Sequence, residues 1–204
     1  MAANSNRDSV PWIMLTSHYP LYCSTCANIA RENISAASWV GPEFGDGSGT
    51  LGVAQLGEQT AGAMQASMLA DLEPLMLKYG VDIYAAGHQH QYESMFPVKH
   101  GKPTATHFVN PAAPVHFLTG NGGPPGIDLF GIDPARGRGE AASFSNTRSL
   151  KFGYGKVHVP NATHFIYQQI ANGYLGDKAG AVLDTVVVTQ TKHGPFGSSA
   201  TSQH

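Results

Sequence analysis

Three histidines stand where two apolar runs end, and imidazole is the nitrogen ligand that transition metals use most often in proteins. His18 follows the run 11–17, and His88 and His90 follow the run 81–87. A His-x-His pair on an extended segment places both rings on one side, because side chains alternate with period two. In open α/β sheets, ligands bind at the carboxyl ends of the strands. We therefore predict that two neighbouring strands bring these histidines together as half of a metal site.

The composition excludes several kinds of partner. The 204 residues carry a net charge of -2, which gives no electrostatic case for binding nucleic acid or an anionic membrane surface. No apolar run reaches the roughly 18 to 20 residues of a membrane span. The polar segment 1–10 lacks the apolar core of a signal peptide. We expect a loop-rich globular chain with no nucleic-acid and no membrane partner.

The elements that must position the histidines alternate between strand and helix. The runs 11–17 and 81–87 suit buried strands covered on both faces. Between them, apolar residues step by three and four along the segment 61–79, which predicts an amphipathic helix packed on the core. Pro74 should kink or restart this helix, and Gly80 should form its C-terminal cap.

The rest of the chain predicts a third short strand and a C-terminal sheet. The strand should cover 115–119, and an antiparallel meander should follow further along the chain. The meander is expected from three segments with turn residues between them, at 156–159, 163–171 and 182–190. Long loops are expected at 23–60 and 127–149, and a frayed tail at 194–204. The fold class is thus α/β (α+β), in one domain.

Short polar motifs leave several alternatives open. Cys23 and Cys26 form a lone Cys-x-x-Cys, for which a local disulfide or two unpaired thiols are favoured over redox chemistry. Asn33 and Asn161 begin glycosylation sequons, which matter only if the chain is secreted. His116 lies on a short strand, where packing or hydrogen bonding is the ordinary expectation.

Two histidine segments together resemble a known family. Residues 17–22 resemble the fourth metallophosphoesterase block, a strand that ends in a metal-binding histidine. Residues 79–93 resemble the fifth block, Gly-His-x-His, with the Val-Asp before it and the Tyr-Glu after it that purple acid phosphatases show. Residues 152–155 and 159–164 are similar to the C-terminal sheet of that family. The resemblance runs from about residue 6 to 188.

The resemblance implies a fold, a cofactor and a reaction. The family fold is a sandwich of two mixed sheets flanked by helices, and its centre holds a ferric ion plus a divalent zinc, manganese or iron. By resemblance His18 and His88 would bind the divalent ion, and His90 the ferric ion. The substrate would be a phosphate ester, attacked at phosphorus by a metal-activated hydroxide. Such phosphatases are secreted or lie in lysosome- or vacuole-like compartments.

The chain also departs from the family pattern. The family's three earlier blocks supply a bridging aspartate, an asparagine, an iron-bound tyrosine and a phosphate-binding histidine, and none is found here. Residues 1–193 therefore read as the C-terminal part of a catalytic domain, inactive by itself. The expected partner is the missing N-terminal half, and an exposed sheet edge would also permit a homo-oligomer. The alternative is a non-catalytic remnant that serves as a binding or structural module.

The general acid and the substrate contacts stay open. The family often has a histidine ten residues after its fourth-block histidine, and this chain has Asn28 there. Asn28, His116 and Asn121 are candidates for substrate binding.

Overall fold

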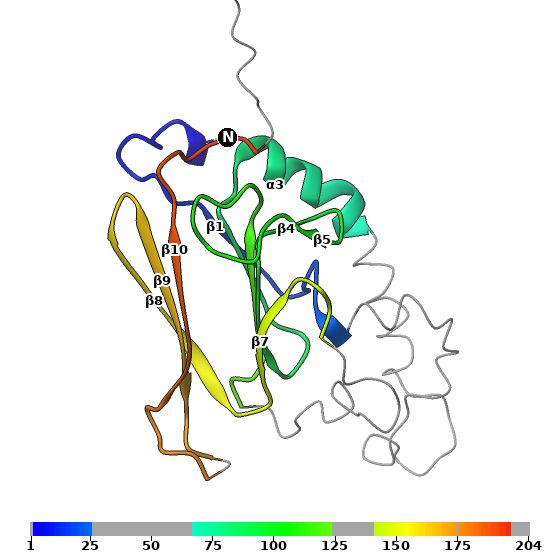
Figure 1. Cartoon of the computed structure of the whole chain (residues 1–204), viewed down its shortest axis with the longest axis vertical. Helices are drawn as coiled ribbons and strands as arrows, with labels where there is room; N and C mark the ends of the chain where they lie inside the picture. The colour runs from blue at the N-terminus through cyan, green and yellow to red at the C-terminus, as the bar shows by residue number, and fades with distance from the viewer. Residues whose placement is uncertain (1, 26–66, 124–140, 175, 197–204) are drawn as a thin grey trace, which may run out of the picture.

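The computed structural model describes residues 2–25, 67–123, 141–174 and 176–196. In this part of the chain, two β-sheets pack face to face, and a helix covers the outer face of the larger one (Figure 1). Mixed sheets with few helices agree with the predicted α/β (α+β) fold class. No described helix is both long and apolar enough to cross a membrane.

The larger sheet has five strands in the order β1-β2-β6-β3-β7. β1, β2 and β6 run parallel, whereas β3 pairs antiparallel with both β6 and β7. The strands are β1 (Met14–Ser17), β2 (Ile83–Ala86), β3 (Tyr92–Met95), β6 (Val115–Thr119) and β7 (Ser145–Ser149). A hairpin beside the sheet joins β4 (Val98–Lys99) to β5 (Lys102–Pro103).

The central strands are buried on both faces, which explains their uninterrupted apolar runs. Ile83 and Ala85 of β2 pack with the smaller sheet, whereas Tyr84 and Ala86 face the helix side. Because side chains alternate along a strand, a strand covered on both sides needs apolar residues at every position. The predictions of strands at 81–87 and 115–119 are confirmed.

β1 differs from the prediction of a strand buried on both faces. It lies at the edge of the sheet, and its side chains alternate between exposed and half-buried. Met14 is 39% exposed, although its register partner Ile83 in β2 is fully buried. Among the described residues, no further strand pairs with β1 on its open side, so the backbone groups on that side can accept another strand.

The smaller sheet is the predicted antiparallel meander. Its strands are ordered β10-β9-β8. They are β8 (Gly153–Asn161), β9 (His164–Ala171) and β10 (Val182–Thr189). Phe165, Tyr167, Val186 and Val188 turn inward and form a core cluster with the larger sheet.

The helix begins and ends where local residues dictate. A π-helical turn η3 (Met68–Leu72) leads into α3 (Glu73–Tyr79), with Pro74 in the first turn of α3. Proline has no backbone N–H to donate and disrupts a regular helix at its position, and the helix changes from π to α geometry here. Gly80 ends the helix in the left-handed conformation, with φ 64°, and its N–H donates to Met76 O. The restart at Pro74 and the cap at Gly80 are confirmed, and residues 61–66 lie outside the described part.

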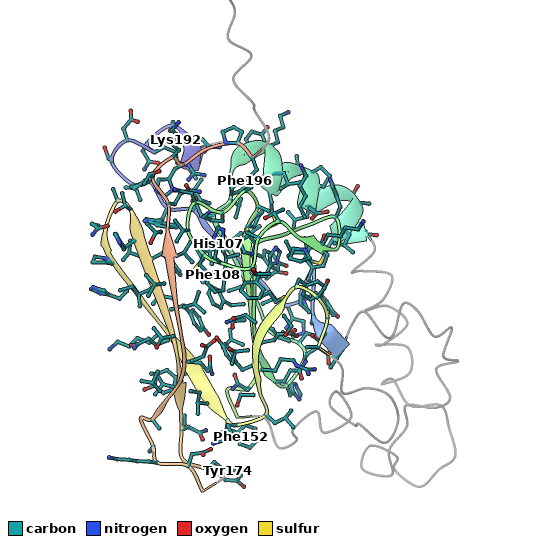
Figure 2. All side chains as sticks on the ribbon, viewed as in Figure 1. His107, Phe108, Phe152, Tyr174, Lys192 and Phe196 are labelled. Atoms are coloured by element: carbon teal, nitrogen blue, oxygen red, sulfur yellow. The ribbon has the colours of Figure 1, made fainter. Side chains whose placement is uncertain are left out.

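Two segments predicted as irregular are ordered in the structure. β7 occupies the end of the predicted loop 127–149, because its polar residues pair with β3 at a sheet edge rather than forming core. Gly194 packs against Gly80, and Phe196 N donates a 2.9 Å hydrogen bond to Leu77 O at the end of α3. Figure 2 shows Phe196 and Lys192 at the α3 end of the molecule, with Phe152 and Tyr174 at the opposite end. The start of the tail, which was predicted to fray, is therefore held against α3 at residues 194–196. The rest of that tail, 197–204, and most of the predicted loop, 26–60, lie outside the described residues.

Candidate metal centre

His18 and His88 meet at the carboxyl ends of β1 and β2. The two strands pair in parallel with Ser17 opposite Ala86, so the residues that follow them emerge side by side. His18 Nε2 lies 3.1 Å from His88 Nδ1, and the ring centroids are 5.0 Å apart. Parallel pairing thus joins two residues that are 70 positions apart in the sequence.

Two hydrogen bonds fix the backbone beneath this histidine pair. Gly87 N donates to His18 O at 3.1 Å, which continues the parallel ladder beyond the last paired residues. The Tyr84 hydroxyl donates to Tyr19 O at 2.7 Å. Burial raises the pKa of Tyr84, so this hydroxyl keeps its proton and remains a donor. Hydrogen bonds from Tyr84 of β2 and from Gly87 just after it therefore hold the segment that carries the His18 ring.

The turn that carries His88 has an unusual backbone. His88 has φ 68°, a left-handed conformation that is costly for a residue with a Cβ atom. Hydrogen bonds inside the turn hold it, from Gln89 N to Gly87 O at 2.9 Å and from Gln91 N to Gln89 O at 2.8 Å. Such strained positions concentrate at functional sites, where the surrounding structure enforces them.

The histidine pair fits one part of a metal's ligand set. Two ligands of one tetrahedral ion, each at about 2.0–2.1 Å, lie roughly 3.3 Å apart, close to the 3.1 Å between these nitrogens. His90 lies two residues after His88 and is half-buried. Within the described residues, no group of three or more His, Cys, Asp or Glu side chains is placed to hold a metal ion. The metal roles of His18, His88 and His90 stay predictions.

Two buried carboxylates, those of Glu73 and Glu93, already accept hydrogen bonds from neighbouring side chains and backbone. Glu93 accepts hydrogen bonds from Ser24 N at 2.9 Å and Ser24 Oγ at 2.5 Å. Glu73 accepts from the Tyr22 hydroxyl at 2.6 Å. Among the described residues, these carboxylates therefore do not stand in for the acidic metal ligands of the family.

A third carboxylate, Asp82, lies at the amino end of β2, away from the histidine pair. It pairs with Arg7 Nη1 at 2.7 Å and His193 Nδ1 at 3.0 Å, and it accepts from Ile13 N at 2.8 Å. His193 Nε2 lies 2.8 Å from Ala162 O in the turn between β8 and β9. This cluster ties both ends of the described chain to the two sheets.

Two of the substrate-binding candidates are enclosed in the core. His116 is 2% exposed and packs between the rings of Tyr22 and Tyr84, with centroids at 5.3 and 5.4 Å. Burial lowers the pKa of His116 to about 3, so its ring is neutral. Asn121 is fully buried, donates to Lys151 O at 2.6 Å and accepts from Gln169 Nε2 at 3.2 Å. Neither position favours contact with a substrate.

The remaining sequence candidates divide between described and undescribed residues. Asn28, Asn33 and Cys26 lie outside the described part. Cys23 is disulfide-bonded, which removes the alternative of a free thiol there. Asn161 is exposed in the turn after β8, and its Oδ1 accepts hydrogen bonds from Thr163 N and His164 N, each at 2.9 Å.

Sequence reasoning missed two residues that shape the histidine pair. Tyr19 contacts both rings, with centroids 4.8 Å from His18 and 4.5 Å from His88. Gly120, just after β6, packs against the turn at Gln89 so closely that a Cβ atom would overlap its carbonyl oxygen. A glycine directly after a buried strand is the one sequence signal that indicates such a close backbone approach.

The matching family model and the similar proteins are all described as acid phosphatases or purple acid phosphatases. The family model described as iron/zinc purple acid phosphatase-like protein C matches residues 113–185. Human acid phosphatase type 7 is 28% identical over 197 residues, covering 94% of this chain and 37% of the human protein. The zebrafish (Danio rerio) protein of the same name is 29% identical over 194 residues, with 93% and 37% covered. Purple acid phosphatase 18 of Arabidopsis thaliana is 28% identical over 163 residues, with 79% and 27% covered.

A solved structure shows the same fold. The purple acid phosphatase PPD1 from yellow lupin (Lupinus luteus) seeds superposes with a TM-score of 0.59 at 19% identity, covering 90% of this chain and 26% of the lupin chain. This chain spans little more than a third of the curated acid phosphatase type 7 proteins, at 37% of their length. Taken with the histidine pair at the ends of parallel strands, these relatives and this fold confirm the predicted resemblance to the purple acid phosphatases.

Proposed function

We propose that this chain forms part of a metal-dependent phosphoric ester hydrolase, with His18 and His88 as ligands of one ion in a dinuclear centre. The observation that carries the proposal is the 3.1 Å approach of His18 Nε2 to His88 Nδ1 where two parallel strands end. His90, on the same turn as His88, would serve the second ion. A ferric ion and a divalent zinc, manganese or iron would supply Lewis acidity toward phosphoryl oxygens and toward a water molecule.

The role of the chain's own residues is to orient neutral nitrogen donors. Neutral imidazoles add no negative charge, so a centre that they bind keeps a net positive charge that attracts an anionic phosphate ester. The strained turn at His88 and the hydrogen bond from Gly87 N to His18 O hold the backbone of both histidines in place before any ligand arrives. Such preorganisation reduces the ordering that binding would otherwise require.

The acidic ligands must come from residues outside the described part, and the open edge of β1 supports one route. A segment that pairs with β1 would place its own carboxyl end beside His18, as the parallel strands β1 and β2 already do. It would also cover Met14, which is 39% exposed at this edge. We propose that an N-terminal half of the catalytic domain fills this place, and that the chain by itself has little or no phosphatase activity.

A metal titration tests the histidine assignment. Isothermal titration of the purified chain with Co²⁺ should show binding that both His18→Asn and His88→Asn weaken by about tenfold or more, since each removes one ligand. His158→Asn is the matched control, because His158 is exposed on β8. Equal Co²⁺ affinity in all four proteins would refute the assignment. Turnover of an aryl phosphate by the chain alone, with iron and zinc added, would refute its predicted inactivity.

A second candidate function is a non-catalytic binding or structural module. The lack of a three-residue metal-ligating group among the described residues favours it. The two functions differ in one measurable respect. A catalytic fragment should gain phosphatase activity when the N-terminal half of a purple acid phosphatase domain is co-expressed with it, whereas a remnant should gain none even if the two parts associate.

We also propose that the protein functions in an oxidising compartment, secreted or lysosome-like, and carries a glycan at Asn161. The disulfide at Cys23 supports this, because structural disulfides persist mainly in such compartments. Asn161 is exposed in a turn, as an acceptor must be. Expression in a eukaryotic secretory host should give a mass shift that glycosidase removes. Asn161→Gln should remove the part of that shift that does not arise from Asn33.

A further inference from the structure

We propose that Tyr19 is a positioning residue that orients the rings of His18 and His88 by aromatic packing. The inference deepens the proposed function and rests on it for the identity of the ligand, although the ring geometry stands by itself. Tyr19 follows His18 directly, at the start of the turn after β1.

The three rings contact one another in a closed triangle. The Tyr19 ring meets His18 nearly perpendicularly, at 79° with centroids 4.8 Å apart. It meets His88 at 53° with centroids 4.5 Å apart, and the two imidazoles meet at 73° and 5.0 Å. These separations and tilts are those of favourable aromatic pairs, which avoid a face-to-face sandwich. Moving either imidazole would break its contact with Tyr19 as well as its contact with the other histidine.

Tyr19 itself is held in place. Its carbonyl accepts the 2.7 Å hydrogen bond from the Tyr84 hydroxyl, and Tyr84 is 1% exposed in β2. The next residues, Pro20 and Leu21, are buried, and Leu21 belongs to the core cluster on the helix side. The backbone of Tyr19 is therefore as fixed as the core, and its ring provides a rigid surface for the imidazoles.

His18 needs such a surface because no hydrogen bond among the described residues orients its second ring nitrogen. Metal-binding histidines normally donate their other ring N–H to a carboxylate or carbonyl, which fixes the plane of the ring. In the described part of the chain, the His18 ring interacts through Nε2 with His88, and its Nδ1 makes no hydrogen bond. The His18 side chain is also exposed. Packing against Tyr19 takes over the orienting role of the usual hydrogen bond.

The test separates the ring of Tyr19 from its hydroxyl. Tyr19→Phe keeps the ring, whereas Tyr19→Leu removes it and leaves the backbone hydrogen bond from Tyr84 intact. Tyr154→Leu is the control for a tyrosine-to-leucine change, because Tyr154 is 56% exposed on β8. For each protein we would record nuclear Overhauser contacts between the His18 and His88 rings, the ¹⁵N shifts of the imidazoles and Co²⁺ affinity by calorimetry.

Tyr19→Phe and Tyr154→Leu should keep the contacts between the imidazoles and the Co²⁺ affinity of the unmodified chain. Tyr19→Leu should lose those contacts and weaken Co²⁺ binding by about two- to tenfold, the equivalent of one aromatic pair. Ring contacts unchanged in Tyr19→Leu would overturn the inference, as would equal losses in Tyr19→Phe and Tyr19→Leu.

If the unmodified chain binds no Co²⁺, the proposed function fails instead. The contacts between the imidazoles need no metal, so they still decide the role of Tyr19. Thermal melts of all four proteins should coincide within a few degrees, which separates loss of ring orientation from loss of folding.

Discussion

Gly120 lies so close to Gln89 that a Cβ atom at position 120 would overlap the carbonyl oxygen of Gln89. Gly120 follows β6, and Gln89 is the central residue of the His-x-His turn. Gly120 N also donates to Gln91 O at 3.2 Å. The segment after β6 therefore supports the strained turn that presents His88 to His18.

This contact predicts that Gly120→Ala displaces the turn and destabilises the fold. We expect a loss of about 1–3 kcal/mol in the free energy of unfolding, the usual cost of overpacking. The imidazole ¹⁵N shift of His88 should move as well. Gly122→Ala is the matched control, because a Cβ there would meet nothing within 4 Å. Equal stability of the two variants in urea denaturation would contradict the prediction.

The buried cluster around Asp82 predicts a larger loss of stability than the contact at Gly120. Asp82→Ala should lower the free energy of unfolding by about 3–5 kcal/mol, because it leaves the buried charge of Arg7 uncompensated. The side chains of Asp82 and Arg7 are 2% and 12% exposed. Chemical denaturation followed by circular dichroism measures this change.

The control is an ion pair of similar chemistry at the surface. Lys151 and Asp177 are 2.5 Å apart, but their side chains are 49% and 19% exposed. Asp177→Ala should cost less than about 1 kcal/mol, as exposed pairs usually do. If Asp82→Ala cost no more than Asp177→Ala, the cluster would not be an anchor of the two chain ends.

His116 predicts a specific dependence of stability on pH. Burial lowers its pKa in the folded chain to about 3, from an ordinary value of 6.5. As pH falls below 6.5, the unfolded chain takes up a proton that the folded chain does not. The contribution of His116 to stability is thus fully present above about pH 6.5. It decreases by up to about 1.4 kcal/mol per pH unit as the pH falls toward 3.

His116→Leu should remove this slope. Between pH 6.5 and pH 5, the unmodified chain should lose about 2 kcal/mol relative to the leucine variant. His158→Leu, at an exposed position on β8, should leave the slope in place. Parallel pH profiles for the unmodified chain and His116→Leu would show that the buried imidazole does not govern acid stability.

Two hydrogen bonds that join β3 of the larger sheet to β10 of the smaller sheet predict a fourth change in stability. The Tyr92 hydroxyl in β3 and the Ser94 hydroxyl each donate a 2.8 Å hydrogen bond to Asp184 Oδ2 in β10. Burial, reinforced by the negative charge of Asp184, raises the pKa of Tyr92, so this donor keeps its proton. Tyr92→Phe should cost about 1.5–3 kcal/mol, the range for a hydrogen bond to a charged group. Tyr174→Phe, at a 78% exposed position, should change stability little in the same thermal scan.

Local patterns determined much of the fold. The apolar run before His88 predicted a strand buried on both faces, and β2 is one. The segment around Pro74 and Gly80 predicted where the helix restarts and ends, because the missing amide of proline and the left-handed cap of glycine are properties of single residues. The meander was predictable because turn residues separate its strands. Similar local rules failed for β7, whose polar residues form a strand only because β3 supplies a pairing edge.

The sequence by itself determined that histidines follow two strands and that the acidic blocks of the family are not found beside them. Only the tertiary structure decided that β1 pairs in parallel with β2 in the register that brings His18 Nε2 to His88 Nδ1. It also decided that β1 lies at an open edge, and that Tyr19 and Gly120 pack against the turn from different strands. Strand register and sheet order depend on contacts between residues far apart in the chain, and these contacts leave no periodicity in the sequence.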